Sequence, residues 1–239
     1  MKLTVVSSGS QGNSYVLEST SGEQLCIEAG RPIKEVRKIA NLKTSRGVGV
    51  VISHAHGDHA KYTKDFLKAG VDVYSTPHLA STALGVVGIE AEKTYSMGDF
   101  RVTPIKVEHD IPTLGFLIYH PTCGTIFFAT DCYNLHQYIR GCTTYMMECN
   151  YEDGLLVRAV NEGKTIASQA DRIRLSHLSE AHAIQFLQEC EAEQSARQVI
   201  LIHGSSRHLN AEQAVSKFQQ VLGIPTYYAR SGMSINLLK

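Results

Sequence analysis

The sequence predicts a layered α/β fold, because short β-branched and aromatic runs alternate with amphipathic helical segments along its 239 residues. Apolar runs of strand length occur at 48–52 and 198–202, and apolar residues recur at helical spacing in 180–193 and 211–222. No tandem repeat, low-complexity segment or linker divides the chain. We therefore expect one domain that spans residues 1–239.

The first half of the chain is predicted to open with a meander of strands. The turn-rich segments 7–14 and 19–22 separate short β-branched runs, and Pro32 is acceptable in the first turn of a helix. In chain order, we expect strands at 3–6, 15–18 and 24–28, a helix at 33–39, a strand at 48–52, a helix at 60–68 with Gly70 near its end, and a strand at 71–75 before a helix that opens at Thr76-Pro77.

The second half of the chain is predicted to continue this alternation. Asn210, followed by Gln213 three residues later, resembles a capping box, and Ser179 is a suitable helix cap. We expect strands at 100–107, 115–119 and 125–129, a helix at 180–193, a strand at 198–202 and a helix at 211–222. Several of these strands end close to a titratable residue, so we look for chemistry at the strand ends.

Composition narrows the class of protein. Lys plus Arg and Asp plus Glu both number 23, so no overall basic field indicates a nucleic-acid partner, although a local basic groove is not excluded. The first apolar stretch is too short for a signal peptide, and no window is apolar enough to span a bilayer. The six cysteines form no Cys-x-x-Cys pair. We expect reduced thiols in a cytoplasmic protein.

Histidine departs from the ordinary pattern, with 11 copies. His54, His56, Asp58 and His59 follow an apolar strand within a few positions, and such nitrogen and carboxylate donors suit zinc, manganese or iron. At strand spacing, His54 and His56 can project to one side, while Asp58 and His59 face a second ion. Two ions about 3.5–4 Å apart would share a water ionised near neutral pH, so metal-bound hydroxide is the expected nucleophile. The alternative is a metal-free polar loop.

The run His54-Ala55-His56-Gly57-Asp58-His59 resembles the signature of the metallo-β-lactamase superfamily, and the resemblance extends over nearly the whole chain. It implies a four-layer αββα sandwich, in which two mixed β-sheets are flanked by helices. The implied ligands are His54, His56 and His109 for one metal, Asp58, His59 and His203 for the other, and Asp131 as the bridge, with Asp58 also orienting the water. Zinc is the expected metal, with manganese and iron as alternatives. Individually, His109, Asp131 and His203 could instead be hydrogen-bonded structural residues.

Two further elements resemble the phosphodiesterase branch that includes tRNase Z. Met147-Glu148-Cys149-Asn150 follows a strand, and Leu175-Ser176-His177-Leu178-Ser179 precedes a helix. Cleavage of a phosphodiester requires a proton for the departing alkoxide, and a histidine polarised by a carboxylate can deliver it. The resemblance thus implies that His177 is the general acid and Glu148 its orienting partner. Capping or core roles are the alternative.

The overall pattern is similar to the YycJ/WalJ-like branch, whose members are linked to exonuclease action on DNA. The similarity lies in the segments 8–14, 28–30, 130–131, 148–150 and 172–179. Glu28 stands where an aspartate is usual, Tyr151 where that branch often has histidine, and Cys132 follows the bridging aspartate. The stretch between Asp131 and His203 is too short for the β-CASP domain that RNA-processing nucleases insert.

The predicted function is that of a metal-dependent phosphodiesterase, a nuclease that acts on DNA as an exonuclease. The alternatives are a phosphodiesterase for cyclic nucleotides or other small molecules, a thiolester or lactone hydrolase, and a non-catalytic binding module. The expected partner is a nucleic acid or nucleotide, with no membrane partner, and the sequence is compatible with a homodimer.

Arg172, Arg174 and Arg207 are candidates for phosphate contacts, against the alternative of solvated surface cations. Surface or hydrogen-bonded core positions are expected for the other histidines: His78, His120, His136, His182 and His208.

Overall fold

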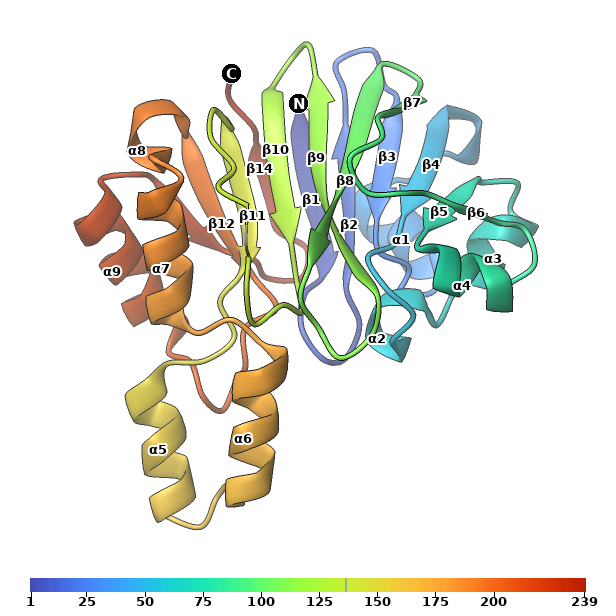
Figure 1. The fold of residues 1–239 in the computed structure, drawn as a ribbon. Helices are drawn as coiled ribbons and strands as arrows, with labels where there is room; N and C mark the ends of the chain where they lie inside the picture. The colour runs from blue at the N-terminus through green and yellow to red at the C-terminus, as the bar shows by residue number, and fades with distance from the viewer. Residues whose placement is uncertain (136) are drawn as a thin grey trace.

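The computed structural model describes residues 1–135 and 137–239 and consists of two seven-stranded β-sheets packed face to face (Figure 1). The strand order is β14-β1-β2-β3-β4-β5-β6 in the first sheet and β13-β12-β11-β10-β9-β8-β7 in the second. Both sheets contain antiparallel and parallel pairs, as at β2–β3 and β3–β4. The predicted sandwich of two mixed sheets flanked by helices is thus confirmed.

The first sheet takes its strands from the N-terminal half of the chain and from the last strand. These are β1 (Lys2–Ser7), β2 (Ser14–Glu18), β3 (Gln24–Ile27), β4 (Gly47–Val51), β5 (Val73–Ser75), β6 (Val86–Gly88) and β14 (Ser234–Asn236). The same part of the chain forms the helices α1 (Ile33–Ala40), α2 (Gly57–Ala60), α3 (Thr63–Lys68) and α4 (Pro77–Thr82), and the 3-10 turn η1 (Thr44–Arg46).

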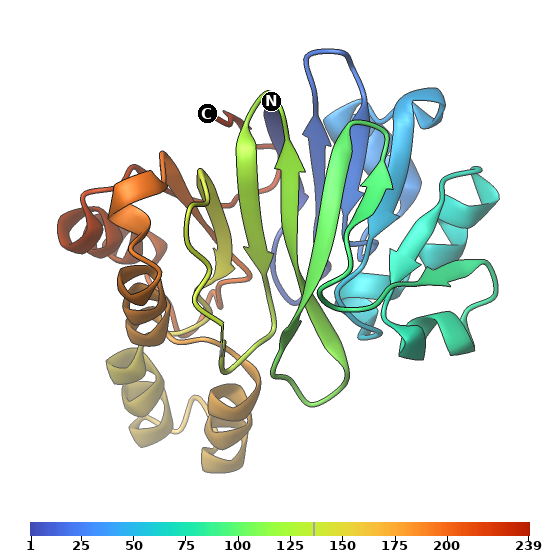
Figure 2. The ribbon, with the colours of Figure 1, turned by 45° about the horizontal axis from the view of Figure 1, so that its top comes forward.

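The second sheet takes its strands from the rest of the chain. These are β7 (Tyr95–Met97), β8 (Phe100–Val107), β9 (Thr113–His120), β10 (Gly124–Ala129), β11 (Thr144–Glu148), β12 (Gln198–Ile202) and β13 (Thr226–Tyr228). Its helices are α5 (Asp153–Asn161), α6 (Ala167–Ser176), α7 (Glu180–Glu189), α8 (Ala192–Ser195) and α9 (Ala211–Leu222). In both views, α5 and α6 extend away from the sandwich as a helical pair (Figures 1 and 2).

Three apolar layers separate the four structural layers. Alternating side chains of one strand point to opposite faces, so Phe128 of β10 packs between the sheets while Phe127 packs under the helices. Phe128 lies against Tyr15 at 5.8 Å between ring centroids, and Phe127 against Phe186 of α7 at 5.4 Å. On the outer face of the first sheet, Val36 of α1 belongs to the third layer. These layers fix the two sheets and the helices on them.

Two predicted helices are each interrupted in the structure. The helix expected at 60–68 is two short helices, α2 and α3, and the helix expected at 180–193 ends at Glu189 and resumes at Ala192. Glu191, between α7 and α8, has a left-handed φ of 53°, which a continuous helix does not allow. Helix α6 and the whole of α5 were not predicted, because their apolar residues face only a small satellite core.

No helix among the described residues has the length and apolarity needed to cross a membrane. All six cysteines are buried and none forms a disulfide.

Candidate metal centre

The predicted site residues meet at one edge of the sandwich, where strands of both sheets end. His54 to His59 follow β4, His109 follows β8, and Asp131 follows β10. Glu148 is the last residue of β11, and His203 comes directly after β12. In open α/β sheets, ligands bind outside the carboxyl ends of strands. The topology therefore gathers side chains that lie up to 149 residues apart in sequence, from His54 to His203.

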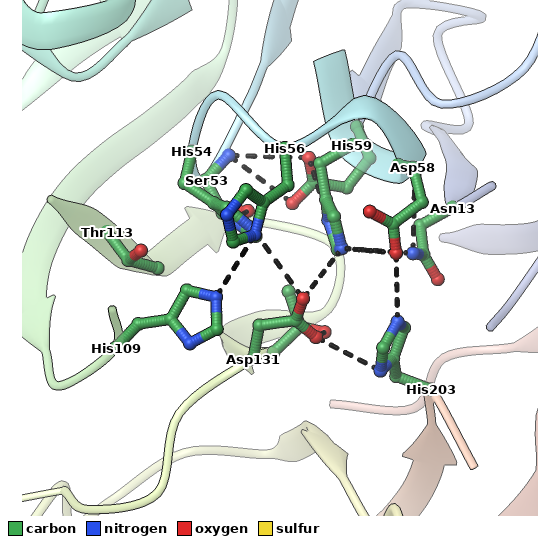
Figure 3. Close-up of polar contacts among 12 residues, drawn as sticks. Asn13, Ser53, His54, His56, Asp58, His59, His109, Thr113, Asp131 and His203 are labelled. Atoms are coloured by element: carbon green, nitrogen blue, oxygen red, sulfur yellow. Dashed lines mark hydrogen bonds and ion pairs between the residues drawn. The ribbon is translucent and has the colours of Figure 1, made fainter. Parts of the chain in front are cut away.

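Three imidazoles form the first group, together with Asp131 (Figure 3). His54 Nε2 lies 3.1 Å from His56 Nδ1, which lies 3.2 Å from His109 Nε2. Asp131 Oδ2 lies 3.5 Å from His54 Nε2. The three histidines and the aspartate each offer one ligand atom, and these atoms all lie within 4.8 Å of one another.

These spacings fit a metal ion. Ligand atoms about 2.0–2.1 Å from a tetrahedral zinc ion are about 3.3 Å apart, close to the separations of the three imidazole nitrogens. The other nitrogen of His54, Nδ1, lies 2.8 Å from Ser53 Oγ, so the hydroxyl can accept a proton from Nδ1 in the tautomer that leaves the Nε2 lone pair for a metal ion. The residues present therefore suit an ion of the zinc, manganese or iron type.

The second group consists of Asp58, His59, His203 and the same Asp131. His59 Nε2 lies 3.3 Å from Asp58 Oδ2 and 3.1 Å from Asp131 Oδ2, and His203 Nε2 lies 3.3 Å from Asp58 Oδ2. One oxygen of Asp131, Oδ2, thus faces both groups. The structure brings all seven predicted ligands together in the predicted division, and their action as ligands stays a prediction.

Two loops hold the second group in place. Asn13 N donates to Asp58 O at 2.7 Å, and Ala29 N donates to His59 O at 2.7 Å. Gly30 lies so close that a Cβ atom there would come within 1.9 Å of Asp58 O and 2.5 Å of Asn13 N. Only glycine permits this approach, which accounts for Gly30 in the segment that follows β3.

Buried carboxylates support the histidine rings from behind. His59 Nδ1 is buried, and Glu28 Oε2 lies 3.5 Å from it, while Glu28 also accepts from Ser53 N at 3.3 Å. His203 Nδ1 lies 3.0 Å from Glu148 Oε1. From the sequence, Glu28 was noted only because an aspartate is usual at its position. Neither Glu28 nor Ser53 was assigned a role. Glu28 ends one predicted strand and Ser53 directly follows another, as the histidine cluster does, and this position could have indicated that they support the site.

Three residues of the site adopt left-handed backbone conformations that are uncommon outside glycine. Glu28, Asp131 and His203 have φ values of 67°, 47° and 52°. Each comes one or two residues after a strand, so the chain turns sharply there and directs its side chain into the site. Such strain persists where the surrounding structure requires it, and it clusters at functional sites.

The charges of the site are arranged to receive cations. Burial opposes protonation of His59 and His203, but the surrounding carboxylates, Asp131 foremost among them, together outweigh it and raise the pKa of both imidazoles well above its usual value. Burial also opposes ionisation of Asp131, yet His203 and His59 hold its pKa well below its usual range. In contrast, burial and the neighbouring His59 lower the pKa of His54. Metal ions bind deprotonated histidines, so loading of the second group releases protons.

Replacing Glu28 with glutamine is expected to weaken metal binding by about 10- to 100-fold, because a group that orients a ligating histidine and raises its basicity is lost. A titration against a chromophoric chelator measures the two dissociation constants. Glu18→Gln is the matched control. Glu18 is the last residue of β2 and pairs with Gln24 at the start of β3, so it lies at the end of these strands away from the site. Unchanged affinity of both ions in Glu28→Gln would contradict this support of His59.

His177 and Glu148, the predicted acid and its partner, are in contact beside the metal cluster. His177 Nδ1 lies 2.7 Å from Glu148 Oε1, and Glu148 is fully buried. Glu148 Oε2 accepts from Cys132 N and Leu178 N, both at 3.2 Å, which fixes the carboxylate. Burial lowers the pKa of His177, but the charge and hydrogen bond of Glu148, together with the charge of Asp131, outweigh it and the pKa is raised. The ring of His177 is left with Nε2 as the nitrogen not bound to Glu148.

The remaining histidines divide between surface and core. His78 and His182 are exposed, and His136 lies outside the described residues. His208 is buried, with Nε2 2.9 Å from Thr165 Oγ1 and Nδ1 3.3 Å from Ser205 Oγ. His120 is buried at the end of β9, and its Nδ1 accepts from Thr122 N at 3.2 Å.

Asp110 is a further carboxylate near the first group, and the sequence did not single it out. Its Oδ1 lies 2.9 Å from His109 Nε2.

A four-layer sandwich with two adjoining histidine and carboxylate groups at its strand ends is the arrangement expected of the superfamily that the histidine motif resembles. The comparison with protein families agrees: residues 31–204 match the beta-lactamase superfamily domain. The chain belongs to this superfamily, whose members are mostly hydrolases.

Individual relatives were found by sequence and by structure. The exodeoxyribonuclease WalJ of Streptococcus pneumoniae is 26% identical over 174 residues, which cover 65% of this chain and 64% of WalJ. The match thus spans less than two thirds of that relative. The structure of the metallo-beta-lactamase fold protein YhfI of Bacillus subtilis superposes on this chain with a TM-score of 0.78 at 15% identity. The superposition covers 98% of this chain and 99% of YhfI.

Two solved structures of enzymes share the fold. The short form of human tRNase Z has a TM-score of 0.69 at 17% identity, and each chain is covered completely. A diphosphatase of the PhnP family has a TM-score of 0.71 at 14% identity, covering 100% of this chain and 99% of that chain.

Proposed function

We propose that this protein is a dinuclear metal-dependent phosphodiesterase that degrades DNA as an exonuclease. The contact between His177 Nδ1 and Glu148 Oε1 at 2.7 Å, beside the two metal-binding groups, carries this proposal. A hydrolase that expels an alkoxide needs such a proton donor, whereas the same metal groups alone suit other hydrolytic reactions. The relatives named as an exodeoxyribonuclease, a tRNase and a diphosphatase support a phosphate ester as substrate.

In this proposal, the first group of residues holds one divalent ion and the second group holds the other, with Asp131 shared. When bound, the two ions supply an ionised water at neutral pH and neutralise charge on the phosphate. Zinc is the first expectation from the histidine-rich donor set, and manganese and iron also suit it. Asp58, whose side chain is 23% exposed, lines the cleft and orients the attacking water.

The proton path runs through one histidine. Glu148 accepts the Nδ1 proton of His177 and fixes the ring, so His177 Nε2 donates its proton to the leaving oxygen. Asn150 Nδ2 donates to His203 O at 2.8 Å, which holds the turn between the acid pair and the second metal group.

A substrate panel tests the proposal. Metal-loaded protein is incubated with single-stranded DNA, double-stranded DNA, RNA, cyclic mononucleotides, bis(p-nitrophenyl) phosphate, a thiolester and a lactone. We expect DNA to be shortened stepwise with release of mononucleotides. Turnover of cyclic mononucleotides alone would refute the nuclease assignment, and turnover of only the thiolester or lactone would also refute the role of His177.

A further inference from the structure

The cleft above the metal groups continues beyond them along α6 and the loop after β12. Its volume is about 790 Å³. Besides the metal-binding side chains and Asp110, Asn150 and His177, its walls are formed by three segments: the loop 7–11, one side of α6, and the loop 204–208. Only part of the cleft is therefore needed to hold the phosphate that is cleaved.

Helix α6 turns a polar face toward the cleft. Gln169, Arg172, Ile173 and Ser176 line the cleft, and their spacing of three, four and seven residues places them on one side of a helix. Arg174 faces elsewhere: it lines a small hollow with side chains of α5, and its Nη1 lies 3.2 Å from Asp171 Oδ1. The sequence could not distinguish these two arginines, and the structure does.

Arg172 and Arg207 are the only lysine or arginine side chains among the described residues that line this cleft. Neither forms an ion pair within the part of the chain that the structure describes, whereas Arg174 does. The carboxylates in the lining, Asp58, Asp110 and Asp131, all belong to or adjoin the metal groups. The cleft therefore carries its negative charge at the metals and two uncompensated guanidinium groups beyond them.

The two walls that present these arginines are tied to each other. Ser205 Oγ accepts from Arg207 N and His208 N, both at 3.3 Å, which shapes the loop 204–208. His208 in turn lies 2.9 Å from Thr165 Oγ1, in the connection between α5 and α6. Helix α6 also leads directly into His177, whose N donates to Ile173 O at 3.0 Å. The backbone segments that carry both arginines are thus tied to each other and to the proposed acid.

We infer that Arg172 and Arg207 bind phosphates next to the scissile one, so that the substrate is a polynucleotide strand rather than a mononucleotide. This inference rests on the proposed phosphodiesterase function. A guanidinium group binds phosphate oxygens in pairs of parallel hydrogen bonds and is always charged. Arg172 lies five positions before His177, which directly follows α6, and five positions correspond to about 7.5 Å along a helix axis, so we expect the two side chains to contact different parts of the strand.

Kinetics on two substrates test the inference with the metal-loaded protein. Bis(p-nitrophenyl) phosphate has one phosphate, whereas a single-stranded 12-mer of DNA has neighbours on both sides of the scissile group. For Arg172→Ala and Arg207→Ala, we expect kcat/KM for the 12-mer to fall about tenfold or more, and at least fivefold more than kcat/KM for the small diester. Arg174→Ala, with the same loss of charge on the same helix, is expected to match the wild type on both substrates.

Binding provides the second measurement. Fluorescence anisotropy with a labelled phosphorothioate 12-mer, which resists hydrolysis, gives the dissociation constant as a function of salt. Each lost phosphate contact is expected to reduce the slope of log K against log salt by about 0.7. Equal losses on both substrates, or an equal effect of Arg174→Ala, would overturn the inference and leave the proposed function intact. Absence of any phosphodiester turnover in the wild type would instead refute the proposed function.

Discussion

Replacing Asp131 with alanine is expected to abolish binding of both metal ions and to reduce turnover to the background rate. Asp131 Oδ2 faces both metal groups, at 3.5 Å from His54 Nε2 and 3.1 Å from His59 Nε2, so its loss removes one donor from each. It also leaves two buried imidazoles, His59 and His203, without the carboxylate that raises their pKa. Elemental analysis after dialysis measures the bound metal.

The matched control for this variant is Asp171→Ala, an exposed aspartate on α6 whose one ion pair among the described residues is with Arg174. Circular dichroism of both variants shows whether the chain is folded, and Asp131→Asn provides a variant of nearly the same shape. If Asp131→Asn is folded and retains two ions with wild-type affinity, Asp131 is not the shared ligand.

Replacing His177 with alanine is expected to lower kcat for DNA by about 10²- to 10⁴-fold, which is the usual contribution of a positioned general acid. Metal content is expected to stay unchanged, because His177 Nδ1 contacts Glu148 Oε1 at 2.7 Å and His177 is not one of the proposed ligands. With bis(p-nitrophenyl) phosphate the loss is expected to be much smaller, because its leaving group departs without a proton.

His182→Ala is the control for this experiment, since His182 is an exposed histidine on the neighbouring helix α7. Three measurements are compared: metal content, kcat on DNA and kcat on the activated diester. Loss of metal equal to that of Asp131→Ala would make His177 a ligand. An equal loss of kcat on both substrates would show that it does not protonate the leaving group.

Much of the fold could be predicted because its strands and helices carry their own periodic signals. Helix α9 begins and ends where the sequence predicts, and Asn210 caps it by accepting from Glu212 N and Gln213 N. The short strands β6, β7, β13 and β14 were not predicted. Each has three residues, too few to show an alternating pattern, and each is held by pairing with a neighbouring strand, which is longer for β7, β13 and β14 and equally short for β6.

The α5–α6 pair could not be predicted for a different physical reason. Its helices bury few side chains, among them Leu156 and Ala170, so neither shows a broad apolar stripe. The pair nevertheless matters for the cleft, because α6 positions Arg172 in its wall. Only the structure shows which of its polar side chains face the cleft.

The candidate site was largely predictable by position in the chain, although its supporting contacts were not. The histidine and aspartate positions follow from the motif and from strand ends, and the structure places them together. The support of His59 by Glu28 and of His203 by Glu148 depends on contacts across strands that adjoin only in the folded sheets. A single sequence contains no record of such contacts, and the same holds for the link between His208 and Thr165.

The metal content of the purified chain decides whether the two histidine and carboxylate groups form a dinuclear centre. Untagged protein is stripped with a chelator, reloaded with zinc, manganese or iron in turn, and analysed by elemental mass spectrometry together with calorimetric titration. The account predicts close to two ions per chain, with release of protons on binding as His59 and His203 lose theirs. A folded chain that takes up none of these ions would contradict it.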